Sequence, residues 1–83
     1  MSMWYVYILR CVDKTLYTGT STDVIRRVKE HNSKKGGAYT KARLPVKVVY
    51  KEPHPTQSQA LKREHHIKGW ARVKKWKLIE NKL

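Results

Sequence analysis

The segment from Met3 to Arg10 carries an apolar or aromatic side chain at every position between Trp4 and Leu9. In a β-strand, successive side chains point to opposite faces, so both faces of this segment are apolar. The two faces are formed by Trp4, Val6 and Ile8, and by Tyr5, Tyr7 and Leu9. Such a strand suits a position that is covered on both sides, so we expect further structure to pack against each face.

Turn signals predict a second strand directly after the first. Residues 12–14 favour a turn, and residues 15–20 are expected to pair back as the second strand of a hairpin. A third strand is expected over 46–52, opened by Pro45 and closed by Pro53 and Pro55, because proline interrupts the regular pairing of strands.

Three helices complete the pattern. The first begins near 21–23, where hydroxyl groups and an aspartate can cap it, and ends near Asn32. The second is expected over 56–68, where the start matches a capping box, and the third over about 70–80. The third helix would have one apolar stripe, formed by Val73, Trp76, Ile79 and Leu83. The predicted fold class is α+β: a small three-stranded antiparallel sheet flanked by helices, in the order β-β-α-β-α-α.

The chain has 83 residues, the size of one small domain. We expect a single domain over 1–83, with its core over about 3–70 and a C-terminal helix over about 70–80. No apolar run approaches the roughly 18 residues of a membrane span, and the N-terminus lacks the features of a signal peptide. Cys11 is the only cysteine, so no disulfide can form within the chain. These features predict a cytoplasmic protein with no membrane partner.

Nineteen Lys and Arg residues against six Asp and Glu residues give the chain a net charge of +13. A charge of this size on so small a surface attracts polyanions, of which nucleic acid is the obvious example. The alternative is a basic surface without a binding role. Binding to a membrane surface is disfavoured, because no predicted helix combines a broad apolar face with a basic one.

Glu64 falls among Ala60, Leu61 and Ile67 on the apolar face of the second predicted helix. A carboxylate in that position requires a compensating cation or metal ion. Two structural alternatives are open, namely an ion pair with an arginine or an exposed position at the edge of this face.

Arg27 and His31 are one turn apart on the first predicted helix, so they are neighbours on its surface. An arginine there is suited to hold a phosphate and to stabilise the charge of a phosphoryl transition state. The alternatives are a solvated arginine and a hydrogen-bonded histidine at a helix end.

Tyr7 and Tyr17 would lie on adjacent strands of the hairpin. Strand tyrosines usually pack in a core, and a phenol with an ordinary pKa of about 10 is a poor base at neutral pH. It becomes plausible as a base only where a nearby cation favours its ionisation. Gly19, where the second strand ends, permits the close approach of a ligand or of backbone, or simply serves the turn into the helix.

Together these residues resemble the signature of the GIY-YIG nuclease superfamily. The first motif reads Tyr5-Val6-Tyr7, without the superfamily's initial glycine, and the second reads Tyr17-Thr18-Gly19. Both variants are similar to the compact, stand-alone bacterial branch. The resemblance continues to Glu64 and covers roughly the first seventy residues. Many larger relatives also carry a core asparagine after the glutamate, for which this chain has no clear equivalent.

The resemblance implies an active site formed by Tyr7, Tyr17, Arg27, His31 and Glu64. By the same resemblance, Glu64 binds one divalent cation, Mg²⁺ (or Mn²⁺), and a tyrosine helps to activate water for in-line attack on a phosphodiester. The implied function is that of a DNA endonuclease, with DNA repair or recombination as the expected context. The rival is a basic nucleic-acid-binding module that retains the nuclease fold without catalysis.

Basic residues on the first predicted helix, in the polar loop over 33–37 and after it are expected to contact DNA phosphates. They are Arg26, Lys34, Lys35, Lys41 and Arg43. No base-reading element is evident, so binding is expected to be electrostatic and largely independent of sequence.

Overall fold

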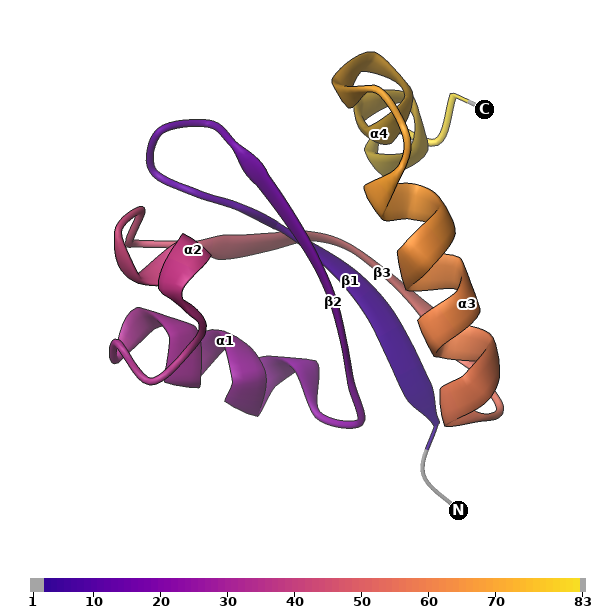
Figure 1. The fold of residues 1–83 in the computed structure, drawn as a ribbon, viewed down its shortest axis with the longest axis horizontal. Helices are drawn as coiled ribbons and strands as arrows, with labels where there is room; N and C mark the ends of the chain where they lie inside the picture. Colours follow the sequence, from indigo (N-terminus) through magenta and orange to yellow (C-terminus); the bar gives the residue numbers. More distant parts are fainter. Residues whose placement is uncertain (1–2, 83) are drawn as a thin grey trace.

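The computed structural model describes residues 3–82, and a three-stranded antiparallel sheet in the order β2-β1-β3 lies at its centre (Figure 1). The strands are β1 (Trp4–Arg10), β2 (Leu16–Ser21) and β3 (Lys47–His54). The first strand is central and pairs antiparallel with both neighbours. The predicted α+β class and antiparallel sheet are therefore confirmed.

Four helices pack around this sheet, and Figure 1 shows α1 and α2 on one side of it and α3 and α4 on the other. The helices are α1 (Val24–Asn32), α2 (Ala38–Lys41), α3 (Gln57–Lys68) and α4 (Arg72–Ile79). The predicted caps form: the Asp23 side chain accepts a hydrogen bond from the Arg26 N–H, and the Thr56 hydroxyl accepts one from the Gln59 N–H. The single turn of α2 is an addition to the predicted order.

The central strand is covered on both faces, as its alternating apolar residues predict. The cluster on one face contains Tyr7, Leu9, Cys11, Val24 and Val46. The cluster on the other face contains Val6, Ile8, Ala60 and Ile67. Tyr7 therefore faces the side of the sheet that α1 covers, whereas α3 covers the opposite side.

The third strand runs two residues further than the predicted range, through Pro53 to His54. The expectation that Pro53 closes the strand is therefore wrong, whereas the strand does end directly before Pro55. Pro53 pairs with Tyr5 of β1. The strand lies at the edge of the sheet, where only one of its sides needs hydrogen-bonding partners, and proline is tolerated at such positions.

The C-terminal helix packs differently from the predicted apolar stripe. Val73 is exposed, so its place on that stripe is wrong. Ile79 of the predicted stripe does pack against the cluster beneath α3, together with Leu78 and with Trp70, which precedes α4. Leu83, the last residue of the stripe, lies outside the described residues.

Within residues 3–82, no helix is long and apolar enough to cross a lipid bilayer.

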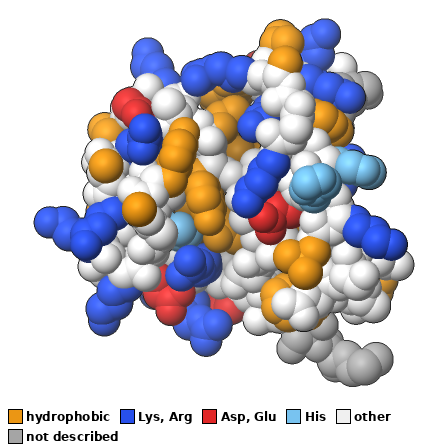
Figure 2. All heavy atoms as spheres, viewed as in Figure 1, with side chains coloured by type: hydrophobic (Ala, Val, Ile, Leu, Met, Phe, Trp, Pro, Cys, Tyr) orange, Lys and Arg blue, Asp and Glu red, His pale blue; other side chains and the backbone are white. Residues whose placement is uncertain are grey.

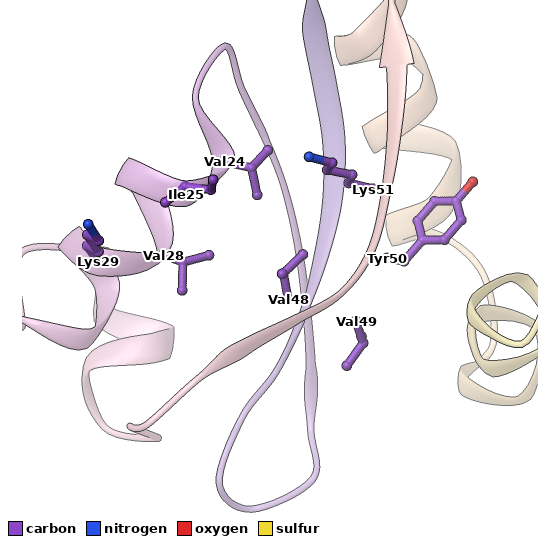
Figure 3. Close-up of a pocket in the computed structure, with 8 residues that line it drawn as sticks. All are labelled: Val24, Ile25, Val28, Lys29, Val48, Val49, Tyr50 and Lys51. Carbon is purple, nitrogen blue, oxygen red and sulfur yellow. The ribbon is translucent and has the colours of Figure 1, made fainter.

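A groove of about 500 Å³ separates α1 from β3. Figure 3 shows Val24 and Val28 of the helix facing Val48 of the strand across it, while Tyr50 points away towards α3. None of the five residues predicted to be catalytic lines this groove. The groove is therefore separate from Tyr7 and Tyr17 and from the predicted catalytic residues.

Candidate active site

Pairing of the first two strands places Tyr7 over Gly19. The two residues are direct partners in the register of β1 with β2. A Cβ atom at Gly19 would lie 2.6 Å from the Tyr7 hydroxyl oxygen, so any other residue would displace the phenol. Gly19 does permit a close approach, but the approaching group is a side chain of the protein itself.

His31 is fully buried, and both of its ring nitrogens have a partner. Nδ1 lies 2.7 Å from Thr40 Oγ1, and the Thr40 hydroxyl donates to the Gly37 carbonyl at 3.2 Å. A hydroxyl has only one proton to donate, so this network assigns the hydrogen to Nδ1 and leaves Nε2 as an acceptor. The Tyr7 hydroxyl, 3.4 Å from Nε2, donates to it. His31 is thus a hydrogen-bonded histidine whose partner is a motif tyrosine.

Burial keeps both members of this pair uncharged at neutral pH. Burial, reinforced by Tyr17 and Glu64 and opposed by Arg27, raises the pKa of Tyr7 to about 12. Burial also lowers the pKa of His31, and the positive charge of Arg27 acts in the same direction. Tyr7 is therefore a hydrogen-bond donor at neutral pH and is poorly suited to act as a base.

Tyr17 is the more accessible of the two motif tyrosines. It is half-buried, whereas only 1% of Tyr7 is exposed. The centre of the Tyr17 ring lies 6.5 Å from that of Tyr7 and 5.4 Å from that of His31, the latter in an edge-to-face arrangement. A substrate that approaches this cluster would meet Tyr17 first.

Arg27 lies at the margin of the same cluster. Its Nη1 atom is 3.2 Å from Glu30 Oε1, in a partly exposed pair between neighbouring turns of α1. Pairs of this kind contribute little to stability. The charge of Arg27 acts on both Tyr7 and His31, so the guanidinium belongs to the cluster while it stays accessible to an anion.

Glu64 approaches from α3, on the other side of the sheet. Its side chain is 17% exposed, and Oε2 lies 2.6 Å from Lys68 Nζ, one turn further along the helix. The ion-pair alternative with an arginine is therefore wrong, because the partner is a lysine. The negative charge of Glu64 contributes to the raised pKa of Tyr7, so the two groups are within electrostatic reach of each other.

The side chains available near the site fit a cation that takes most of its ligands from water and from phosphate groups. Within residues 3–82, no three His, Cys, Asp or Glu side chains gather closely enough to hold a metal ion by themselves. Magnesium is commonly bound by one or two carboxylates together with waters and substrate phosphates. Glu64 supplies one shielded carboxylate of this type, and Lys68 would compete with a cation for it.

Glu52 is a second shielded carboxylate, which the sequence patterns did not reveal. Its side chain is 16% exposed, and Oε2 accepts a hydrogen bond from Arg63 Nε at 2.9 Å and lies 2.6 Å from His54 Nε2. Burial acts to raise the pKa of Glu52, but hydrogen bonds from Tyr50, Arg63 and His54 hold it below its ordinary value. Because Arg63 precedes Glu64 in the chain, this cluster ties β3 to the helix that carries Glu64.

The residues expected to contact phosphates fall into two kinds. Four of them have exposed side chains, namely Arg26, Lys34, Lys35 and Lys41. Arg43 is instead held by the protein: Nη1 donates to the Tyr39 carbonyl at 2.8 Å, and Nε lies 3.1 Å from Asp13 Oδ2. Figure 2 shows basic side chains bordering an apolar strip that runs between the α1 and α3 halves of this face.

Thr40 and Gly36 are further site residues that sequence reasoning missed. Thr40 sets the tautomer of His31, and Gly36 leaves room for its ring. The one available signal was the glycine pair in the loop over 33–37, which was interpreted as an exposed loop.

The sequence matches a known family and proteins of similar length. The GIY-YIG catalytic domain matches residues 3–78. A UPF0213 protein of Haloquadratum walsbyi is 54% identical over 76 residues, which cover 92% of this chain and 85% of that protein. A UPF0213 protein of Staphylococcus aureus is 49% identical over 82 residues, which cover 99% of this chain and 100% of that protein.

Two solution NMR structures share the fold. The UPF0213 protein from Bacillus halodurans superposes with a TM-score of 0.62 at 43% identity, covering 99% of this chain and 86% of that one. A protein from E. faecalis superposes with a TM-score of 0.66 at 34% identity, covering 98% of this chain and 86% of that one. The domain match, the relatives and the shared fold agree, and the chain belongs to the GIY-YIG catalytic domain family.

Proposed function

We propose that this protein is a nuclease that hydrolyses DNA phosphodiester bonds with one divalent cation, Mg²⁺ or Mn²⁺. The observation that supports the proposal is the cluster of the accessible Tyr17 with the buried pair of Tyr7 and His31, which has the partly exposed Arg27 at its margin and Glu64 within electrostatic reach. Phosphoryl transfer depends mainly on positioning and on stabilisation of charge, and this grouping supplies groups for both.

The accessible groups would carry the chemistry. The guanidinium of Arg27 holds a non-bridging phosphate oxygen and stabilises the charge of the transition state. The hydroxyl of Tyr17 orients the attacking water and takes its proton as the phenol releases its own proton to solvent. A bond forms between the water oxygen and phosphorus, the ester P–O bond on the opposite side breaks, and the departing oxygen takes a proton from solvent. Glu64 would hold the cation, which supplies positive charge to the phosphate when bound.

The buried groups would act as positioning residues. Thr40 fixes the tautomer of His31, and Nε2 of His31 accepts a hydrogen bond from the Tyr7 hydroxyl. These hydrogen bonds between neutral groups hold the rings of Tyr7 and His31 next to the ring of Tyr17. Its role is to keep the phenol of Tyr17 in one orientation.

The rival function is DNA binding without cleavage, and the net charge of +13 favours binding under either function. In both cases, affinity for DNA should fall steeply as salt rises from about 50 to 200 mM. Glu64 favours the nuclease, because a carboxylate near the bound phosphates weakens binding and a protein that only binds DNA does not need a metal ligand there.

A single-turnover cleavage assay tests the proposal. Labelled single-stranded, duplex and branched DNA would be incubated with the protein and Mg²⁺, Mn²⁺ or a chelator. We expect cleavage with either metal and none with the chelator, and a preference for branched DNA would support a role in repair or recombination. Arg27→Ala should slow cleavage at least 100-fold, whereas Lys62→Ala, an exposed residue of α3, should change it little. A folded parent protein that binds DNA but cleaves none would leave the binding module as the function.

A further inference from the structure

Tyr39 is an exposed aromatic side chain that none of the roles above uses. The single turn of α2 directs Thr40 inwards to His31 and leaves Tyr39 outside, with 41% of its surface exposed. The centre of its ring lies 6.0 Å from that of Tyr17, and the two ring planes are 31° apart. Tyr39 therefore extends the aromatic cluster from the buried site to the molecular surface.

Arg43 holds this ring from one side. Its guanidinium lies 4.1 Å from the centre of the Tyr39 ring, and Nη1 donates to the Tyr39 carbonyl at 2.8 Å. A carboxylate oxygen of Asp13, 3.1 Å from Nε, restrains the guanidinium further. The ring and the guanidinium thus form a restrained stack, and ordering it on binding costs little conformational entropy.

The chemistry of this stack matches a nucleobase. Exposed aromatic rings and arginine planes are the surfaces on which proteins stack the unpaired bases of single strands. Bases inside a duplex already stack on their neighbours, so they are not free to stack on a protein ring. The basic surface attracts the DNA backbone, and the adjacent Tyr17 marks where the phosphate would lie.

We propose that Tyr39, supported by Arg43, forms a stacking subsite for an unpaired nucleobase that flanks the phosphodiester at Tyr17. The location relative to the cleaved bond rests on the proposed nuclease function, but the stacking itself requires no cleavage. The substrate class that follows is DNA with unpaired nucleotides at the cleavage point, such as a single strand, a flap or a frayed end.

Binding in the presence of a chelator tests the subsite without any chemistry. Affinity would be measured by fluorescence anisotropy for a single-stranded oligonucleotide and for a blunt duplex of the same length. Tyr39→Ala should weaken single-strand binding about 5- to 150-fold and duplex binding less than about twofold. Tyr39→Phe should bind both as the parent does. Lys41→Ala, an exposed neighbour in α2, should weaken both slightly and to the same extent.

A second variant and a second readout make the test independent of small changes in fold. Arg43→Lys keeps the positive charge but lacks the planar guanidinium, so it should weaken single-strand binding selectively. An oligonucleotide with 2-aminopurine should lose fluorescence on binding the parent and lose much less with Tyr39→Ala. The subsite is ruled out if folded Tyr39→Ala binds the single strand as the parent does, or loses equal affinity for single strand and duplex. A parent that never cleaves DNA would overturn the nuclease and leave this result standing.

Discussion

Gly36 lies so close to the buried imidazole of His31 that a Cβ atom at Gly36 would overlap the ring at Nδ1. The histidine is thereby enclosed by the Tyr7 hydroxyl at one nitrogen, the Thr40 hydroxyl at the other and the Gly36 backbone against its ring. The loop after α1, which sequence reasoning interpreted as exposed, is thus anchored to the site. The same loop leads into α2, which carries Tyr39.

The contact of Gly36 with His31 predicts a difference between two adjacent glycines. Gly36→Ala should lower the free energy of unfolding by about 1–3 kcal/mol, because the added methyl group overpacks a filled site. Gly37→Ala is the matched control: a Cβ atom at Gly37 meets nothing within 4 Å, so the change should stay within about 0.5 kcal/mol. Urea unfolding of both variants checks this, and equal losses would refute the contact.

The environment of His31 predicts a pH dependence of stability. The pKa of His31 in the folded protein lies below its ordinary value of 6.5, so between these two values the unfolded chain binds more protons than the folded one. The stabilising contribution is therefore fully present above pH 6.5 and is lost as pH falls through the folded pKa.

Urea unfolding at several pH values between about 7.5 and 5.5 should show this loss in the parent and a weaker loss in His31→Gln. The lowered pKa of Glu52 also couples its ionisation to folding, but that contribution is lost only as pH falls below about 4.5, outside this window. Parallel pH profiles for parent and His31→Gln would assign the titration to another group.

The difference in exposure between the two motif tyrosines predicts different effects of removing each hydroxyl. Tyr17→Phe should reduce the single-turnover cleavage rate on the order of 100-fold with little change in stability. Tyr7→Phe leaves Nε2 of His31 without its donor, so it should lower stability by about 1 kcal/mol and slow cleavage less. Tyr5→Phe, on the same strand as Tyr7, is the control and should behave as the parent. Parent-like cleavage by folded Tyr17→Phe would remove that phenol from the mechanism.

The pairing of Glu64 with Lys68 predicts opposite effects on metal use. Glu64→Gln should abolish cleavage while DNA binding persists or tightens, because it removes the proposed metal ligand and a repulsive charge. Lys68→Met frees the carboxylate from a partly exposed ion pair, so the Mg²⁺ concentration for half-maximal cleavage should fall about 2- to 5-fold. Normal Mg²⁺-dependent cleavage by Glu64→Gln would place the metal ligand elsewhere, with Glu30 as the next candidate.

Most of the fold was predictable because short sequence patterns indicate where its strands and helices lie. The alternating apolar residues of β1 predicted cover on both of its faces, and the caps at Asp23 and Thr56 predicted the starts of two helices. The errors arose where tertiary position overrides a local rule. The third strand continues through Pro53 because it lies at the edge of the sheet. The residues of a strand do not by themselves show whether it is an edge strand or a central one.

Residue spacing was enough to show which side chains share a strand face or a helix turn, since those relations follow from the periods of strand and helix. Tyr7 and Tyr17 on paired strands, and Arg27 one turn before His31, are relations of this kind. Their chemical roles remain predictions. Contacts between groups that are distant in the chain depend on how the elements pack. Tyr7 reaches His31 across 24 residues, and Thr40 fixes the tautomer of His31 from 9 residues away.

Contacts that residue spacing did not predict depend on tertiary packing in the same way. Glu52 is shielded by Arg63, 11 residues further along the chain, and the guanidinium of Arg43 stacks on the ring of Tyr39. Burial and hydrogen-bond partners set the charge state of each group, and both depend on how β1, α2 and α3 pack together. Residue spacing does not show how these elements pack. It can therefore identify candidate residues of the site, but it does not reveal their protonation states, their hydrogen-bond partners or the exposed Tyr39 ring beside them.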